Sequence, residues 1–210
     1  ATLLGGYKAG IIDEAQHLNV NAANALLKVL EEPTQKTVII LITDDLSKLP
    51  KTILSRSQVL KFLPVSSSEI ESRLSDKRLA RLAFGRPGVA VSFLEDREKL
   101  ESYLSRVRLF FEVLPLDLNG RFNLIESVED GEVPEMLGDW QNVLRDLVLL
   151  KTDNEELVAN LDFISALEKY SKKLSFSQMK GMLNQLKLSQ EYLEQNISPK
   201  NVLENLMVNL

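Results

Sequence analysis

A short apolar run that ends in two acidic residues constrains the fold of this chain more than any other feature. Gly10-Ile11-Ile12 is followed at once by Asp13 and Glu14. A buried strand that delivers carboxylates at its carboxyl end is typical of an open α/β sheet, where ligands collect at that edge. Carboxylates in this position can hold a magnesium ion and polarise an attacking water. The alternative is that the pair only ends a strand at a polar turn.

A helix is predicted directly after the acid pair. Asn19 is a good N-cap residue because its side chain can accept a hydrogen bond from a free backbone N–H of the first turn. Apolar residues then recur at helical spacing, at Ala23, Leu26, Leu27 and Leu30. The run Glu31-Glu32-Pro33 is expected to stop the helix, since the residue before a proline disfavours the helical conformation.

A second strand is predicted at residues 37–43, which read Thr-Val-Ile-Ile-Leu-Ile-Thr. The run is β-branched and apolar on both faces, as expected of a strand buried in a parallel sheet. A strand, a helix and a second strand in this order indicate an α/β unit with parallel pairing. The polar residues Thr43, Asp44 and Asp45 end the run.

The whole string from Gly10 to Pro33 resembles the Walker B segment of the clamp-loader subunits of bacterial DNA polymerase III. In that segment an Ile-Ile-Asp-Glu-Ala strand end is followed by Asn-Ala-Leu-Leu-Lys-x-Leu-Glu-Glu-Pro. The family is the AAA+ ATPases, and the branch comprises the γ/τ and δ′ subunits. The resemblance implies that Asp13 and Glu14 are nucleotide-site acids, and that Asp13 meets magnesium through bound ATP. It also implies a sensor 1 role for Thr43, with Asp44 or a simple strand-end turn as alternatives.

A second segment extends the resemblance to residues 48–58. Leu-Pro-Lys-Thr-Ile-Leu-Ser-Arg-Ser-Gln is similar to the family's Leu-Pro-x-Thr-Ile-x-Ser-Arg-Cys-Gln, with Ser57 in place of cysteine. In the family this arginine crosses a subunit interface and stabilises charge on the neighbour's γ-phosphate, which would make Arg56 an arginine finger. A guanidinium suits that task because its planar, permanently charged fork matches phosphate oxygens. The alternative is an ordinary surface arginine.

A domain boundary is predicted at Pro64, where a proline and three serines precede Glu69 in a capping-box-like arrangement. Residues 59–62 are expected to form a short strand that closes the α/β core. A small helical lid should occupy residues 64–94. Its Gly85-Arg86-Pro87-Gly88 turn resembles the family's sensor 2 position, where Gly88 stands in place of the arginine of ATP-binding subunits. Arg86 lies two residues early, and this form of the motif is more like δ′ than γ/τ.

From residue 95 onward the chain is expected to be an all-α bundle. Apolar stripes at helical spacing predict successive helices, broken between Pro115 and Gly120 and again near Gly131. Most stripe residues are expected to be ordinary core, and Pro199 should start the last helix. The segments 140–151 and 196–206 resemble the δ′ C-terminal collar domain, which implies a role in oligomer assembly.

Composition removes several classes of function. The 210 residues contain one histidine and no cysteine, so neither a Ser/His/Asp triad nor a thiolate metal site is expected. The net charge of −5 argues against a protein that grips DNA over a broad surface. No apolar run approaches the length of a membrane span. The phosphate-cradling Gly-x-x-x-x-Gly-Lys-Ser/Thr is absent from these residues, so the chain is expected to begin in mid-domain.

These observations combine into one expectation. Residues 1–63 are half of an AAA+ α/β core with a parallel sheet, residues 64–94 a helical lid, and residues 95–210 an all-α collar, so the whole is mostly α. The resemblance implies a cytoplasmic δ′-type stator that contacts γ/τ and δ subunits, the sliding clamp and, through the complex, primed DNA. ATP and magnesium would act in the complex, and none is expected on this chain alone. The chain is not expected to be an active ATPase by itself. The alternatives are an ATP-hydrolysing γ/τ-type motor and a silent structural adaptor.

Overall fold

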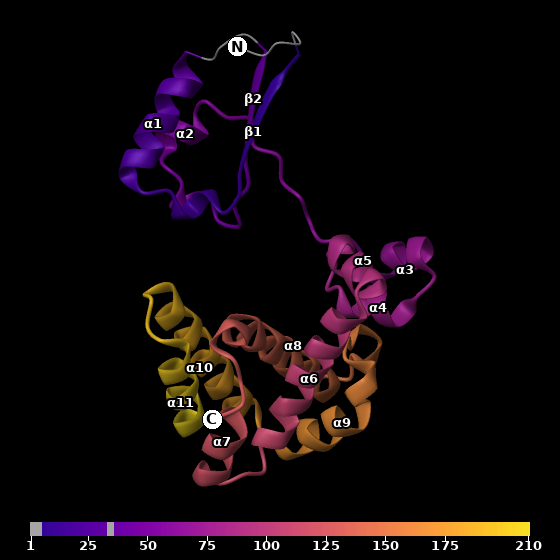
Figure 1. Ribbon diagram of the computed structural model, residues 1–210. Helices are drawn as coiled ribbons and strands as arrows, with labels where there is room; N and C mark the ends of the chain where they lie inside the picture. The colour runs from indigo at the N-terminus through magenta and orange to yellow at the C-terminus, as the bar shows by residue number, and fades with distance from the viewer. Residues whose placement is uncertain (1–5, 33–35) are drawn as a thin grey trace. The chain divides into compact units, whose positions relative to one another are not determined.

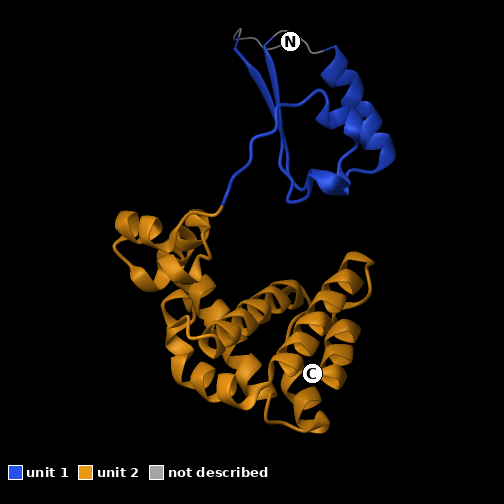
Figure 2. Ribbon diagram, turned by 180° about the vertical axis from the view of Figure 1, so that it is seen from behind, with its two compact units in different colours: residues 1–63 blue, residues 64–210 orange. Residues whose placement is uncertain are grey.

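The computed structural model describes residues 6–32 and 36–210, which are mostly helical with one small sheet (Figure 1). The chain divides into two compact units, residues 1–63 and 64–210 (Figure 2). The division falls at Pro64, where the proline and serines predicted a boundary. Each unit is described by itself below. Among the described helices, none is long and apolar enough to cross a membrane.

Unit 1 is built on two parallel strands, as the strand–helix–strand pattern predicted. Strand β1 (Lys8–Ile12) pairs with β2 (Thr37–Leu41), and the register runs from Lys8 opposite Thr37 to Ile12 opposite Leu41. Helix α1 (Val20–Glu31) connects them, and the predicted cap is present, since the Asn19 side chain accepts a hydrogen bond from the backbone N–H of Ala22 at 2.9 Å. The short helix α2 (Lys51–Leu54) follows. The predicted stop at Pro33 lies outside the described residues.

The two helices of unit 1 cover one face of its sheet (Figure 1). Their buried residues Ala23, Leu26 and Ile53 pack against the inward side chains of the strands. The other face is open: Val38, Ile40 and Ile42 are 43%, 45% and 48% exposed. The expectation of a strand buried on both faces is therefore wrong within unit 1, because no described element of that unit covers the second face.

The strand expected at residues 59–62 is also absent from the described structure. Residues 58–66 carry no regular secondary structure, and Phe62 and Leu63 are 94% and 78% exposed. A strand needs a neighbouring edge to satisfy its backbone hydrogen bonds, and no described backbone hydrogen bond joins this segment to β1 or β2. Its β-rich sequence therefore remains an extended connection at the end of unit 1.

Unit 2 opens with three short helices: α3 (Ser67–Leu74), α4 (Lys77–Leu82) and α5 (Pro87–Glu95). The predicted serine cap is Ser66, which accepts from the N–H of Glu69 at 3.2 Å. A tight turn then joins α3 to α4, because Ser75 is left-handed at φ 56° and Asp76 caps the next helix. Gly85 is needed where it stands: its φ is +78°, and an added Cβ would lie 2.6 Å from the Cβ of Pro64.

Six further α-helices complete the described part of unit 2. They are α6 (Arg97–Val113), α7 (Leu118–Ile125), α8 (Val133–Lys151), α9 (Ile164–Lys173), α10 (Phe176–Glu194) and α11 (Pro199–Asn209). The last begins at its proline, as predicted. One expectation differs: α7 begins before Gly120, because the Asp117 side chain caps it by accepting from the Gly120 N–H at 2.9 Å. The predicted break is thus only Leu114 to Asp117.

The apolar stripes of these helices form one continuous core, as expected of ordinary packing. Trp140 is fully buried, meets Phe110 edge-on at 5.4 Å between ring centroids, and donates its indole N–H to the Arg106 carbonyl at 2.9 Å. A buried polar group is satisfied within the same core. One carboxylate oxygen of Asp146 accepts from the backbone N–H of Asn160 at 2.8 Å and from its side chain at 2.8 Å.

The expected lid and collar belong to the same compact unit. Arg81 donates to the Val158 carbonyl at 3.0 Å, and Arg78 pairs with Asp162 at 2.6 Å. Leu82 of α4 is part of the large core of the long helices. The expected border between residues 94 and 95 therefore falls at the last residue of α5, and it does not separate two compact units.

Candidate nucleotide-interface site

The acid pair lies at the carboxyl edge of the two-stranded sheet. The chain is held there by hydrogen bonds from the N–H of Ile42 to the Ile12 carbonyl at 2.9 Å and from the N–H of Ala15 to the Ile42 carbonyl at 2.8 Å. Both acids are exposed. Glu14 takes a left-handed conformation at φ 50° and donates its N–H to the Asp13 carboxylate at 2.9 Å. The edge thus presents two carboxylates to solvent.

Thr43 reaches the same edge because Ile12 and Leu41 are opposite one another in the register. Its hydroxyl donates to the Asp45 carbonyl at 3.1 Å and accepts from the Asp45 N–H at 3.2 Å. This is a local turn, so the hydroxyl would have to exchange a partner to meet a phosphate. The structure therefore brings Asp13, Glu14 and Thr43 to one edge of the sheet.

Arg56 follows α2 and has a partner that the sequence did not indicate. Its Nη2 pairs with the Glu31 carboxylate at 2.9 Å, and its Nη1 donates to the Thr52 carbonyl at 3.2 Å. The side chains of Arg56 and Glu31 are 39% and 52% exposed. Nothing in the local spacing links the two residues, since α1 and α2 come together only through their packing in the folded unit.

Within unit 1, Arg56 and its ion-pair partner Glu31 lie away from the acid pair Asp13 and Glu14. Helix α1 begins a few residues after Asp13 and Glu14 and runs back along the sheet, and Glu31 is its last residue (Figure 1). A helix of this length spans roughly 16 Å between its first and last residues. Arg56 therefore lies near the far end of α1 from the carboxylate edge, and the structure does not join it to Asp13, Glu14 or Thr43.

The acid pair fits a magnesium ion that is held mainly by nucleotide phosphates. Among the described residues, no group of three or more His, Cys, Asp or Glu side chains could hold a metal ion. Magnesium commonly uses one or two carboxylates, with phosphate oxygens and waters as its other ligands. Asp13 and Glu14 can supply that part, while the printed sequence contains no phosphate-binding loop to supply the rest.

In unit 2, Gly88 lies in the first turn of α5, and Arg86 is the residue before that helix. Arg86 lines a groove that also contains Arg106 and Asp139. Arg106 pairs with Asp139 at 2.7 Å, and burial raises the pKa of that carboxyl to about 6. The sequence did not single out this pair, because its members lie on separate helices.

The chain is similar to known proteins both in its first third and over nearly its whole length. Residues 1–66 match a family model described as the DNA polymerase III delta subunit. Over 97% of its length, the chain is 27% identical to the DNA polymerase III delta′ subunit of Bacillus subtilis, of which it covers 65%. The chain thus spans less than two thirds of that relative.

Shorter or more distant matches come from the same group of proteins. The chain is 55% identical over 53 residues to the delta′ subunit of Pseudomonas aeruginosa, which is 25% of this chain and 16% of that protein. It is 30% identical over 195 residues to the gamma/tau subunit of Mycoplasma genitalium, which is 79% of this chain and 32% of that protein. The chain is therefore similar to the delta′ and gamma/tau subunits of DNA polymerase III.

Proposed function

We propose that this chain acts as a delta′-type stator in a clamp loader and supplies Arg56 to the ATP site of a neighbouring subunit. The observation that carries the proposal is the position of Arg56. It lies near the end of α1 that is remote from Asp13 and Glu14, held only by an exposed ion pair to Glu31 and local hydrogen bonds. An arginine so placed is available to a phosphate outside its own unit.

The chemistry of that role is charge stabilisation. As the γ-phosphoryl group transfers, negative charge grows on its oxygens, and a guanidinium fork can hold two of them at once. Arg56 must first leave Glu31. An exposed ion pair such as Arg56–Glu31 stabilises the fold by at most about 1 kcal/mol. A phosphate in a desolvated site would therefore bind the Arg56 guanidinium more strongly than Glu31 does. Glu31 would then act as a resting position for the side chain.

The proposed partners are those that the resemblance to clamp-loader subunits implies. The proposed neighbours are gamma/tau and delta subunits, and the assembly acts on the sliding clamp and primed DNA in the cytoplasm. ATP and magnesium belong to the complex. Within this chain Asp13 and Glu14 would meet the magnesium of a nucleotide, and Thr43 would sense the terminal phosphate.

One observation favours a second candidate, an ATP-hydrolysing gamma/tau-type motor. Asp13 and Glu14 are both present and both exposed at the carboxyl edge, as an active site requires. Against it stand Gly88 in place of an arginine and the length of the delta′ match, which runs over 97% of the chain. A silent adaptor is the third candidate, and it predicts no effect from any change at Arg56.

The test is Arg56→Ala in a reconstituted loader in which only the ATP site facing this chain can hydrolyse. We expect ATP turnover there to fall by about 10³-fold while the ring still assembles. Arg56→Lys should restore little, because an ammonium cannot make the forked contact. The matched control is Arg97→Ala, which removes another exposed, singly paired arginine. Turnover at the wild-type rate in an intact ring would eliminate the finger role.

A further inference from the structure

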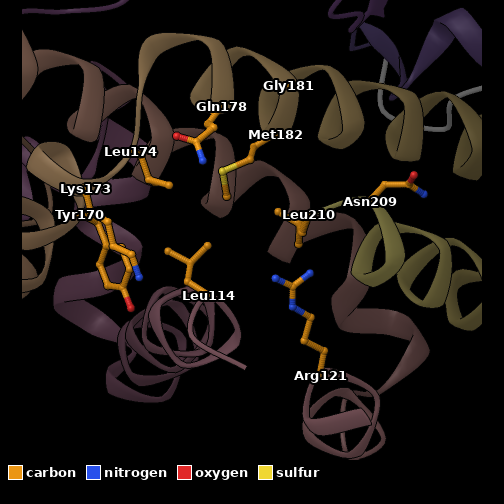
Figure 3. Close-up of a pocket in the computed structure, with 10 residues that line it drawn as sticks. All are labelled: Leu114, Arg121, Tyr170, Lys173, Leu174, Gln178, Gly181, Met182, Asn209 and Leu210. Atoms are coloured by element: carbon orange, nitrogen blue, oxygen red, sulfur yellow. The ribbon is translucent and has the colours of Figure 1, made fainter. Parts of the chain in front are cut away.

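Unit 2 contains a pocket that lies outside the candidate site described above. It has a volume of about 410 Å³ and lies among α7, α9, α10 and α11 (Figure 3). Leu114, Leu174 and Met182 supply its apolar lining, and Arg121 and Lys173 supply its charge. The pocket has the size of a ligand site, and its lining is divided between apolar residues and polar or charged ones.

The charge of the pocket is opposite to that of the chain. Its lining holds two cations and no Asp or Glu side chain, whereas the chain as a whole carries a net charge of −5. An acidic ligand would therefore meet complementary charge in this pocket. The pocket therefore favours a ligand with negative charge.

Arg121 is held in place for such a ligand. Its Nη1 donates to the Met207 carbonyl at 2.9 Å and its Nε to the Leu116 carbonyl at 3.2 Å, which anchors the guanidinium on two sides. No described hydrogen bond uses Nη2, and Figure 3 shows the guanidinium directed from α7 toward the pocket residues. Lys173 stands on the opposite side of the pocket, beside Tyr170.

We propose that this pocket binds an acidic segment of a partner protein, in which a leucine-like side chain lies between two carboxylates. The aliphatic side chain would pack on the apolar lining, and the carboxylates would meet Arg121 on one side and Lys173 on the other. Two cations are too few for a nucleic-acid path, which needs a row of basic side chains. The proposal depends only on unit 2 and stands apart from the role of Arg56.

The probe is a fluorescent peptide, acetylated and amidated, of sequence Glu-Asp-Leu-Leu-Asp-Glu, titrated with the whole chain by fluorescence anisotropy. Two comparison peptides separate the contributions: one has Gln and Asn in place of the acids, and the other has Ser in place of both Leu. We expect each to bind at least tenfold more weakly. Equal binding of the acidic and neutral peptides would overturn the proposal, as would an absence of binding by the acidic peptide at millimolar concentration.

A glycine in the wall allows the pocket to be filled without damage to the helix. A Cβ placed on Gly181 of α10 meets nothing within 4 Å, and a leucine is the better helix former. Gly181→Leu should therefore weaken peptide binding at least tenfold and leave the midpoint of thermal unfolding unchanged or higher. Gly138→Leu is the matched control, since Gly138 is an equally open glycine of α8 outside this pocket. Wild-type affinity in Gly181→Leu would refute the site.

Charge reversal tests the ionic part separately. Lys173→Glu should weaken the acidic peptide about fivefold and leave the neutral peptide unaffected, in line with an exposed ion pair. Lys187→Glu makes the same change in net charge on an exposed residue of α10 that does not line the pocket. If both variants weakened binding equally, the effect would come from overall charge, and the assignment of Lys173 to the site would be wrong.

Discussion

Unit 1 and unit 2 have similarly apolar sequences, but they differ in how completely they bury their large apolar side chains. Unit 2 buries its large side chains on itself, from Trp140 and Phe110 to Leu206, in one core shared by short and long helices. Unit 1 covers one face of a two-stranded sheet and leaves the other exposed, along with Phe62. Two strands alone are marginally stable, so unit 2 is a self-sufficient scaffold and unit 1 is the weaker part, which carries the candidate chemistry.

The largest effect is expected in the core of unit 2. Trp140→Ala removes a fully buried ring, its edge contact with Phe110 and its hydrogen bond to Arg106. It should lower the free energy of unfolding by about 3–5 kcal/mol in urea denaturation followed by circular dichroism. Phe62→Ala is the contrasting control, because that ring is 94% exposed. A loss below about 1 kcal/mol for Trp140→Ala would show that the core is not closely packed.

A smaller effect should appear as a pH dependence of unit 2. Burial raises the pKa of Asp139 to about 6, above the value of about 3.9 in an unfolded chain. Between these values the folded state keeps a proton that the unfolded state has released, so this group lowers stability as pH rises. The stability of wild type minus that of Asp139→Asn should fall by about 2 kcal/mol between pH 4 and 7.

The competing effect is the pairing of Asp139 with Arg106 at 2.7 Å. If that pair outweighed burial, the same difference would rise with pH instead of falling. Glu135→Gln is the matched control, since it removes a 69% exposed acid from the same guanidinium. The sign of the slope therefore decides between burial and pairing.

The smallest effect separates the two faces of the sheet in unit 1. Ile39 and Ile40 are neighbours on β2, and only Ile39 packs beneath the helices, while Ile40 is 45% exposed. Ile40→Thr should cost less than about 0.5 kcal/mol and Ile39→Thr about 1–3 kcal/mol. The measurement is the urea dependence of amide protection in β1 and β2. Equal losses at both positions would mean that the second face is also covered.

Local features of this fold could be predicted from sequence. The caps at Asn19 and Ser66, the proline start of α11 and the parallel pairing of β1 with β2 were all anticipated. The caps and the proline start depend on residues close together along the chain, where hydrogen bonding and helical spacing act directly. The parallel pairing joins more distant residues, and it was predicted from the order strand, helix, strand.

Features that depend on distant segments could not be predicted in this way. A β-rich composition favoured a strand at residues 59–62, but strand formation needs a partner edge that composition does not reveal. The pairing of Arg56 with Glu31 depends on how α2 packs on α1. The pocket around Arg121 takes residues from several helices. In each case the decisive neighbour is set by tertiary packing.

Hydrogen exchange of the whole chain, followed by mass spectrometry, tests the contrast between the two units most directly. Amides of α6, α8 and α10 in unit 2 should exchange only on global unfolding of that unit, because their helices enclose the main core. Amides of β1, β2 and α1 in unit 1 should exchange at least tenfold faster under the same conditions. Equal protection in the two units would contradict the account, since it would make unit 1 as self-sufficient as unit 2.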